Sequence, residues 1–211
     1  MASLKGAVTA NCPQGCGEFE TEVWSLIRAD QDPDLTDTIR GGELNLVQCP
    51  HCQALFYSPV PVIYLDPPVD LCAFIYPADA PREGVEEKLK ADFAALKDGL
   101  LRELKMQAEP LVFFGMEAFK EFLEKEQFLR DESEIIDYAA REQELEVAPL
   151  KPAVSRELDW PYRVPVLKAG RTVENVLTGC DRVLENYAHL ARLEKFRAAL
   201  AQKPELVREL L

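Results

Sequence analysis

Four cysteines in the first quarter of the chain have the types and spacing of a metal site. Cys12 and Cys16 are separated by three residues, and Cys49 and Cys52 are separated by two. A short turn of this kind aims two thiolates at one ion, and two such turns supply the four ligands of a closed tetrahedral site. The sequence therefore predicts a structural Zn²⁺ ion that is bound by both cysteine pairs.

The second pair, with the sequence Cys-Pro-His-Cys, also has the residue types of an oxidising dithiol, in which a helix N-terminus lowers a thiol pKa. The following residues, 53–62, contain two prolines and are typical of strand and extended chain. Residues 1–6 lack a charged stretch before an apolar run, so we expect a cytoplasmic protein with reduced thiols. Zinc is favoured, and a redox or hydrolytic enzyme that uses Cys49 and Cys52 stays as an alternative.

A catalytic role for the metal is not favoured. Catalytic zinc keeps an open coordination position, whereas four cysteines saturate the ion. The nucleobase deaminases are excluded because neither His51 nor His189 begins the His-x-Glu motif that they require. His51 is expected to be a solvated residue of the second turn, and no catalytic residues are predicted. Cys180 and His189 lie nine positions apart, on opposite sides of a helix, and cannot form a dyad there.

The residues around the cysteines predict a β-rich N-terminal part. Residues 18–27 alternate in polarity as a half-buried strand does, and a short helix capped by Asp34 is expected to end at Gly41 and Gly42. Further strands are expected at 44–48, 55–57, 60–65 and 71–76, in an antiparallel sheet. Cys72 is predicted to be a small buried side chain of the last of these strands. Loss of the metal, which contributes on the order of 10 kcal/mol to folding, should unfold this part.

Helical periodicity dominates the rest of the chain. Apolar residues spaced three or four apart predict a helix from Val85 to near Pro110, and two more helices over 116–123 and about 131–139, the latter with a solvated acidic first turn. Four prolines within 147–170 predict an extended segment. Residues 173–191 have heptad-like spacing, which fits a self-associating coiled coil or a long helix packed on its own domain.

The predicted fold is therefore α+β, a zinc-ribbon-like antiparallel sheet followed by a helical region with a long C-terminal helix. The predicted parts of the chain are a β domain (1–80), a helical region (81–146), a Pro-rich extended segment (147–170) and the C-terminal helix (171–211).

The charge of the chain limits its partners. The 211 residues carry 24 Lys and Arg against 37 Asp and Glu, a net charge of −13, and residues 1–80 hold 3 basic against 11 acidic residues. A protein that grips nucleic acid must offer cations to the phosphates, so direct nucleic-acid binding is not expected. The sequence contains no apolar run near the ~20 residues of a membrane span, so no membrane contact is expected.

The order of these motifs resembles the bacterial CpXC protein family, which is named for its paired cysteines and has no known activity. The resemblance covers roughly residues 10–145. It rests on Cys12-Pro13 to Cys16-Gly17, the acidic strand, Asp32-Pro33-Asp34-Leu35, Gly42-Glu43-Leu44-Asn45, Cys49-Pro50-His51-Cys52 and Ile63-Tyr64-Leu65-Asp66. The first pair has one residue more than the Cys-Pro-x-Cys pattern. The resemblance implies that the family's paired cysteines correspond to those of this chain.

These observations favour a non-catalytic, zinc-stabilised interaction or scaffold protein that binds a protein partner, or itself, through amphipathic helices. A regulator that reaches transcription or nucleic-acid machinery through basic protein partners is the alternative from another functional class.

Overall fold

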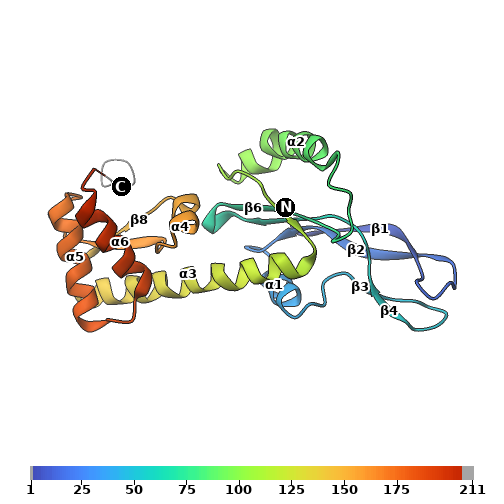
Figure 1. Cartoon of the computed structure of the whole chain (residues 1–211), viewed down its shortest axis with the longest axis horizontal. Helices are drawn as coiled ribbons and strands as arrows, with labels where there is room; N and C mark the ends of the chain where they lie inside the picture. Colours follow the sequence, from blue (N-terminus) through green and yellow to red (C-terminus); the bar gives the residue numbers. More distant parts are fainter. Residues whose placement is uncertain (1, 206–211) are drawn as a thin grey trace. The chain divides into compact units, whose positions relative to one another are not determined.

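The computed structural model describes residues 2–205, and the chain divides into two compact units, unit 1 (residues 1–123) and unit 2 (residues 124–211) (Figure 1). The strands of unit 1 are β1 (Leu4–Asn11), β2 (Glu18–Arg28), β3 (Leu46–Gln48), β4 (Leu55–Tyr57), β5 (Val62–Asp66), β6 (Leu71–Tyr76) and β7 (Leu111–Phe114). Its helices are α1 (Pro33–Arg40), the 3-10 turn η1 (Pro67–Val69), α2 (Val85–Leu96) and the π-helical turn η2 (Lys97–Leu101). Helix α3 (Met116–Glu142) contains the boundary between the units. The predicted α+β class is confirmed.

The main sheet of unit 1 is mixed. Its strand order is β1-β2-β5-β6-β7, in which the pairs β1–β2 and β5–β6 are antiparallel and the pairs β2–β5 and β6–β7 are parallel. The prediction of an antiparallel sheet is therefore correct for the hairpins and wrong for the two crossover connections. The sequence pattern does not predict β1, because its apolar residues are small and interrupted by Gly6.

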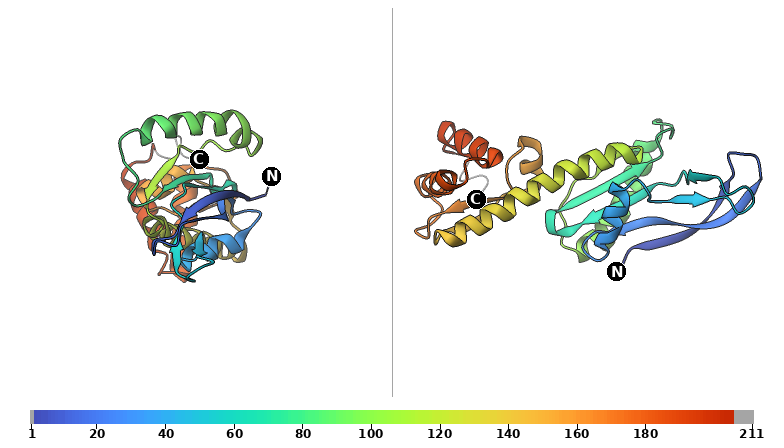
Figure 2. Two further views of the ribbon diagram at one scale, coloured as in Figure 1. Left: turned by 90° about the vertical axis from the view of Figure 1, so that its right-hand side faces the viewer. Right: turned by 90° about the horizontal axis from the view of Figure 1, so that it is seen from below.

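Helices cover both faces of this sheet, as the end-on view in Figure 2 shows for unit 1. All six residues of β6 are buried, because its side chains alternate between the two faces. Cys72, Phe74 and Tyr76 pack with α2 in one cluster. On the other face Tyr64 lies edge-on to Phe119 of α3, with ring centroids 5.0 Å apart. The buried core of unit 1 thus lies around β5 and β6.

Strands β3 and β4 form a separate two-stranded ribbon. They pair antiparallel, with Val47 opposite Phe56. Val47 is buried, and the Phe56 ring lies edge-on to Phe19 of β2, with centroids 6.1 Å apart. This contact holds the ribbon against the β1–β2 hairpin, next to the two cysteine pairs.

Unit 2 combines the C-terminal part of α3 with α4 (Pro152–Leu158), α5 (Val173–Asn186) and α6 (Ala191–Gln202), and with the antiparallel pair of β8 (Glu146–Pro149) and β9 (Arg163–Val166). The segment predicted to be extended contains α4, because Pro152 occupies the first turn of this helix, where a proline is tolerated. The residues with heptad-like spacing pack in the core of unit 2: Cys180 is buried there with its neighbours Val176 and Val183, and Leu177 and Leu184 are partly buried against them.

The C-terminal helix is split in two. Helix α5 ends at Asn186, and α6 begins at Ala191 after a turn in which the Leu190 N–H donates to the Tyr187 carbonyl. The prediction of one long helix is wrong here, because the turn lets Leu190 and Leu193 enter the same core as α5. The last six residues of the predicted helix, 206–211, lie outside the described residues.

Helix α3 is continuous where the sequence predicted two helices. Asp131 and Ser133, at the expected start of the second of these helices, lie inside the continuous helix. The Ser133 hydroxyl donates to the carbonyl of Leu129, four residues earlier, and also accepts the Tyr162 N–H. Because these two hydrogen bonds satisfy its hydroxyl, Ser133 is accommodated inside the helix and does not end it.

Candidate metal centre

The first cysteine pair lies in the turn between β1 and β2. The Cys12 N–H donates to the Gly17 carbonyl (3.1 Å), and the Gly15 N–H donates to the Cys12 carbonyl (3.0 Å). The Gln14 N–H lies 3.4 Å from the Cys12 sulfur, as a donor to it. Gly15 and Gly17 have φ angles of 78° and 99°, which favour glycine. The glycines therefore accommodate the extra residue of this turn.

The second pair lies in the turn between β3 and β4. The Cys49 N–H donates to the Ala54 carbonyl and the Gln53 N–H donates to the Cys49 carbonyl, both at 2.9 Å. Gln53 has a φ angle of 61°, so the position after Cys52 carries a side chain in a left-handed conformation. The two turns thus have the same role: each closes a hairpin and presents two sulfurs.

The four sulfurs converge at one point. The Sγ atoms of both pairs lie within 4.8 Å of one another, and those of Cys12 and Cys52 are 3.6 Å apart. A disulfide needs an S–S bond of about 2.05 Å, and all four thiols are free. A tetrahedron of sulfurs at the Zn–S distance of about 2.3 Å has edges of about 3.8 Å. The arrangement therefore fits a single tetrahedral ion.

The charge distribution at these thiols fits the same interpretation. Burial pushes the pKa of Cys12 upward, but N–H groups of Cys16 and Gln14 outweigh it and lower that pKa to about 7. The pKa of Cys16 is raised to about 12, mainly by its contacts with the sulfurs of Cys52 and Cys12. Once one thiolate forms, the neighbouring thiols resist ionisation. Four thiolates at this spacing need a cation among them.

Two of the four cysteines are buried and two reach the surface. Cys12 and Cys49 are 4% and 0% exposed, whereas Cys16 and Cys52 lie at the surface. His51 is exposed and does not belong to the cluster. A metal ion held by four thiolates supplies a rigid crosslink between the two turns. Within the described residues, the four cysteines are the one group of potential ligands with mutually close ligand atoms.

The remaining cysteines have no part in this centre. Cys72 and Cys180 are buried, and burial raises the pKa of each thiol to about 12. Cys72 is thus the small core side chain that the sequence predicted. Cys180 packs in the core of unit 2, whereas His189 is exposed.

The stretch predicted as a solvated acidic turn is exposed at Asp131 and Glu134 but buries Glu132. Both Glu132 and Asp137 belong to the interior turns of α3, not to a first turn. The Glu132 carboxylate accepts the N–H groups of Arg192 and Leu193 at 2.9 and 3.0 Å, and therefore caps the start of α6. Asp137 accepts from Arg163.

A second buried carboxylate, Glu126, was not singled out in the sequence. It accepts from the Tyr162 hydroxyl and lies 3.1 Å from Arg156 and 3.9 Å from Arg130. Burial is the main cause that raises the pKa of Tyr162, with the Glu126 charge second. Arg130 lies four residues after Glu126 on the same helix, a spacing that the sequence shows, whereas the pairing with Arg156 depends on the fold of unit 2.

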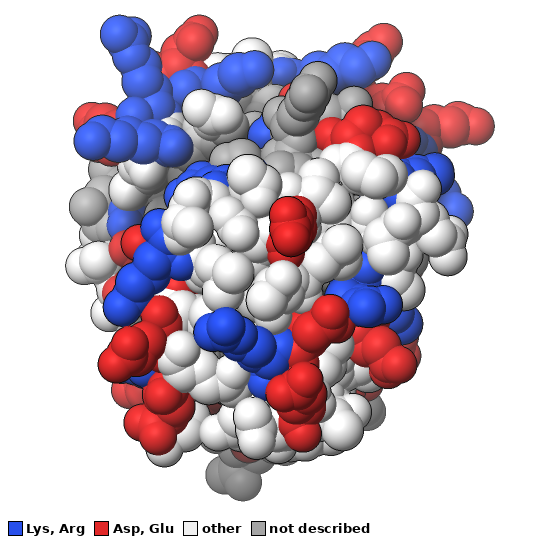
Figure 3. Space-filling view, turned by 90° about the vertical axis from the view of Figure 1, so that its left-hand side faces the viewer, with Lys and Arg blue, Asp and Glu red and all other residues white. Residues whose placement is uncertain are grey.

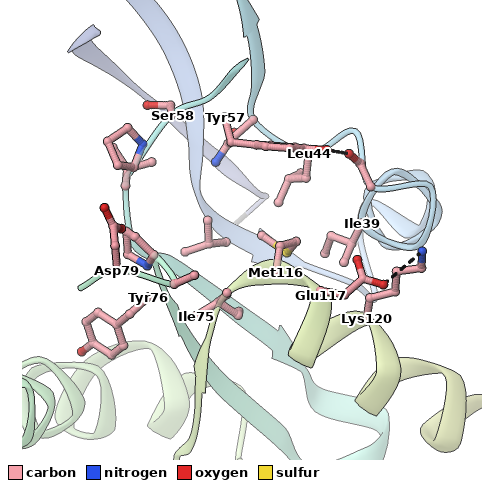
Figure 4. A pocket seen from close by; sticks show the side chains of 18 residues that line it. Ile39, Leu44, Tyr57, Ser58, Ile75, Tyr76, Asp79, Met116, Glu117 and Lys120 are labelled. Carbon is pink, nitrogen blue, oxygen red and sulfur yellow. Dashed lines mark hydrogen bonds and ion pairs between the residues drawn. The ribbon is translucent and has the colours of Figure 1, made fainter. Parts of the chain in front are cut away.

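An apolar pocket in unit 1 is the other feature that the sequence did not indicate (Figure 4). It has a volume of about 440 Å³ and is lined from α1, from the chain after β4, from the ends of β5 and β6 and from the start of α3. Because these segments are far apart in the sequence, periodicity alone could not reveal it.

Comparison with known families identifies the class of protein. The model of the CpXC protein family matches residues 10–137, which is more than half of the chain and includes both cysteine pairs. The protein therefore belongs to the CpXC family, as the order of its motifs predicted. No curated protein and no solved structure matches it. Within residues 2–205, the helices fall short of the length and apolar character that crossing a membrane requires.

Proposed function

We propose that this protein is a non-catalytic, zinc-stabilised module that binds another protein. The convergence of four cysteine sulfurs within 4.8 Å carries this proposal, because four thiolates complete the coordination of the ion and leave no position for a substrate. Tetrahedral sulfur ligands favour zinc or iron, and zinc is the ion for which a role in structure alone is typical.

The rest of unit 1 supports a binding role. Its 20 Asp and Glu against 10 Lys and Arg give a net charge of −10, which disfavours direct contact with nucleic acid and favours basic protein partners. The proposal places the protein in a reducing compartment such as the cytosol, since thiolate ligands are lost when they are oxidised.

Native mass spectrometry of the full chain tests the metal and the assembly together. We expect one zinc ion per chain in the wild type and in Cys180→Ala, which removes a buried thiol outside the centre. Cys52→Ser should lose the ion. Iron in place of zinc, or a metal-free chain in which the two cysteine turns stay ordered, would overturn the zinc assignment. A metal-loaded monomer that turns over a thiol or ester substrate would overturn the non-catalytic role.

Thiol titration separates structure from redox chemistry. Cys16 and Cys52 are exposed, so in the absence of metal a thiol reagent can reach both sulfurs. With the ion bound, we expect all four cysteines of the centre to be protected until a chelator is added. A pair that reacts while zinc stays bound would favour the dithiol alternative.

A further inference from the structure

The pocket of unit 1 has an apolar floor and an open mouth. Ile39, Leu44, Ile75 and Met116 point into it in Figure 4. Its volume of about 440 Å³ lies in the range of ligand sites and is large enough for one aromatic or branched aliphatic side chain with part of its backbone. The feature that must be explained is which class of molecule fills it.

Two polar side chains of the lining, Tyr57 and Asn45, are already engaged by hydrogen bonds within unit 1. The Tyr57 hydroxyl donates to the Gly42 carbonyl. The Asn45 side chain accepts the Trp24 N–H at 2.7 Å and donates to the Trp24 carbonyl at 2.8 Å. These groups are used by the fold, whereas small-molecule sites place a few polar groups toward the ligand.

An exposed apolar strip continues from the pocket along the β3–β4 ribbon. Tyr57 lines the pocket and lies opposite Leu46 in the ribbon, and Leu55 lies on the same face because it is two residues from Tyr57. Leu46, Leu55 and Tyr57 are 37%, 62% and 57% exposed. An apolar surface that extends beyond a pocket fits an extended peptide better than a compact ligand.

The charged residues at the mouth of the pocket indicate the sign of the charge that a partner should carry there. Asp79 and Glu117 lie at opposite sides of the pocket in Figure 4, and Lys120 is 3.6 Å from Glu117. That pair leaves the carboxylate of Asp79 as the uncompensated charge among the labelled residues. Together with the net charge of −10 on unit 1, this favours a cationic ligand.

From these observations we infer that the pocket and the strip Leu46, Leu55 and Tyr57 bind a basic, extended segment of a partner protein. One large apolar side chain of this segment fills the pocket, and a neighbouring Lys or Arg lies near Asp79. The inference rests on the proposed binding function and names its surface. It also links the surface to the metal, because the ribbon that carries the strip is closed by the turn of Cys49 and Cys52.

The test uses the full zinc-loaded chain and three capped hexapeptides observed by amide chemical-shift changes. The first is Lys-Arg-Phe-Leu-Arg-Lys, the second replaces its basic residues with Glu, and the third replaces Phe and Leu with Ala. We expect the first to shift amides that line the pocket, and each of the others to bind at least about tenfold more weakly, as the loss of a large apolar anchor predicts. Shifts that lie elsewhere, equal binding by all three, or no binding at about 1 mM would overturn the inference.

Matched variants locate the contact. Ala78 is exposed and lines the pocket, so Ala78→Phe should fill the mouth and weaken binding about tenfold, while Ala7→Phe on β1 should not. Asp79→Lys should weaken binding about fivefold at low salt, and Asp98→Lys should not. Unchanged binding in Ala78→Phe would overturn the proposed surface.

The docking surface and the metal can fail separately. If the chain as isolated binds no zinc but its pocket amides respond to the basic peptide, the zinc assignment is wrong and the docking surface is kept. A zinc-loaded chain whose pocket amides do not respond would keep the metal and remove the surface.

Discussion

The two units keep their charged residues for different purposes. In unit 2, Glu126 and Glu132 are buried and bonded to arginines or to backbone N–H groups, and its 14 Lys and Arg nearly balance 17 Asp and Glu. On the face of this unit in Figure 3, basic and acidic side chains are interspersed. In unit 1 the acids outnumber the bases twofold, and the centre that joins its hairpins consists of cysteines.

The two units therefore hold their peripheral elements in place in different ways. Unit 2 uses its own side chains, and these are present as soon as the chain folds. The cysteine turns of unit 1 need an ion from outside. The order of unit 1 near the centre should therefore depend on metal supply, and unit 2 should not.

Metal removal is the strongest way to break the comparison. A structural zinc contributes on the order of 10 kcal/mol, so a chelator should abolish hydrogen-exchange protection in residues 12–20 and 46–57. Residues 62–76 should keep their protection, because the core around β5 and β6 does not include the cysteine turns. The sequence predicted that the whole N-terminal part unfolds without the metal, whereas the structure limits the expected unfolding to the residues around the cysteine turns. Equal loss in unit 2 would contradict the comparison.

Glu126→Ala should lower the stability of unit 2 and leave the metal centre of unit 1 unchanged. Removal of this buried carboxylate deletes one ion-pair partner of Arg156 and the acceptor of the Tyr162 hydroxyl, which costs about 3–5 kcal/mol. The free energy of unfolding, measured with denaturant, should fall for unit 2, while zinc content stays unchanged. Glu124→Ala is the control, since Glu124 is exposed on the same helix. A loss below about 1 kcal/mol would contradict the role of Glu126.

Gly179→Ala tests the close packing of α5 on β9 in unit 2, and Gly99→Ala at an open position in unit 1 serves as its control. A Cβ atom at Gly179 would lie 2.5 Å from the Pro165 carbonyl oxygen of β9, so α5 must move and stability should fall by about 1–3 kcal/mol. Gly99→Ala in η2 meets no atom within 4 Å, so it should leave stability unchanged or raise it by up to about 1 kcal/mol. Thermal unfolding of both variants measures the contrast, and equal shifts would disprove it.

Gln53→Gly gives the smallest expected effect and sharpens the description of the second turn. The left-handed conformation of Gln53 is strained for a residue with a Cβ atom, so glycine should raise the stability of zinc-loaded unit 1 by up to about 1 kcal/mol. Gln48→Gly in the adjoining strand should instead lower it by about 0.5–1 kcal/mol. A competition titration with a zinc chelator should show the same order of affinities.

The sequence predicted the features that depend on local spacing. The convergence of two cysteine turns, the end of α1 at Gly41 and Gly42, and the buried position of Cys72 all follow from types and intervals within a few residues. The end of α1 was right but its start was not: Pro33 lies in the first turn, and the position predicted for the cap, Asp34, lies inside the helix. A proline at the start is as clear a signal as an acidic cap.

The features that the sequence did not predict depend on contacts between distant segments. The parallel pairing of β2 with β5 joins residues that are almost forty positions apart. The continuity of α3 depends on Ser133. Its hydroxyl donates to the Leu129 carbonyl and accepts the N–H of Tyr162, the residue before β9. The break between α5 and α6 is fixed by Glu132, sixty positions earlier. Periodicity within a window cannot contain such partners.

The interval between the two cysteine turns has a consequence for synthesis. As the chain leaves the ribosome, Cys12 and Cys16 emerge well before Cys49 and Cys52, with β2 and α1 between them. A nascent chain therefore exposes two thiols before the other two ligands of the centre exist. Until the last cysteine emerges, the first turn is open to oxidants and to competing metals, so the nascent chain depends on a reducing environment earlier than the finished protein does.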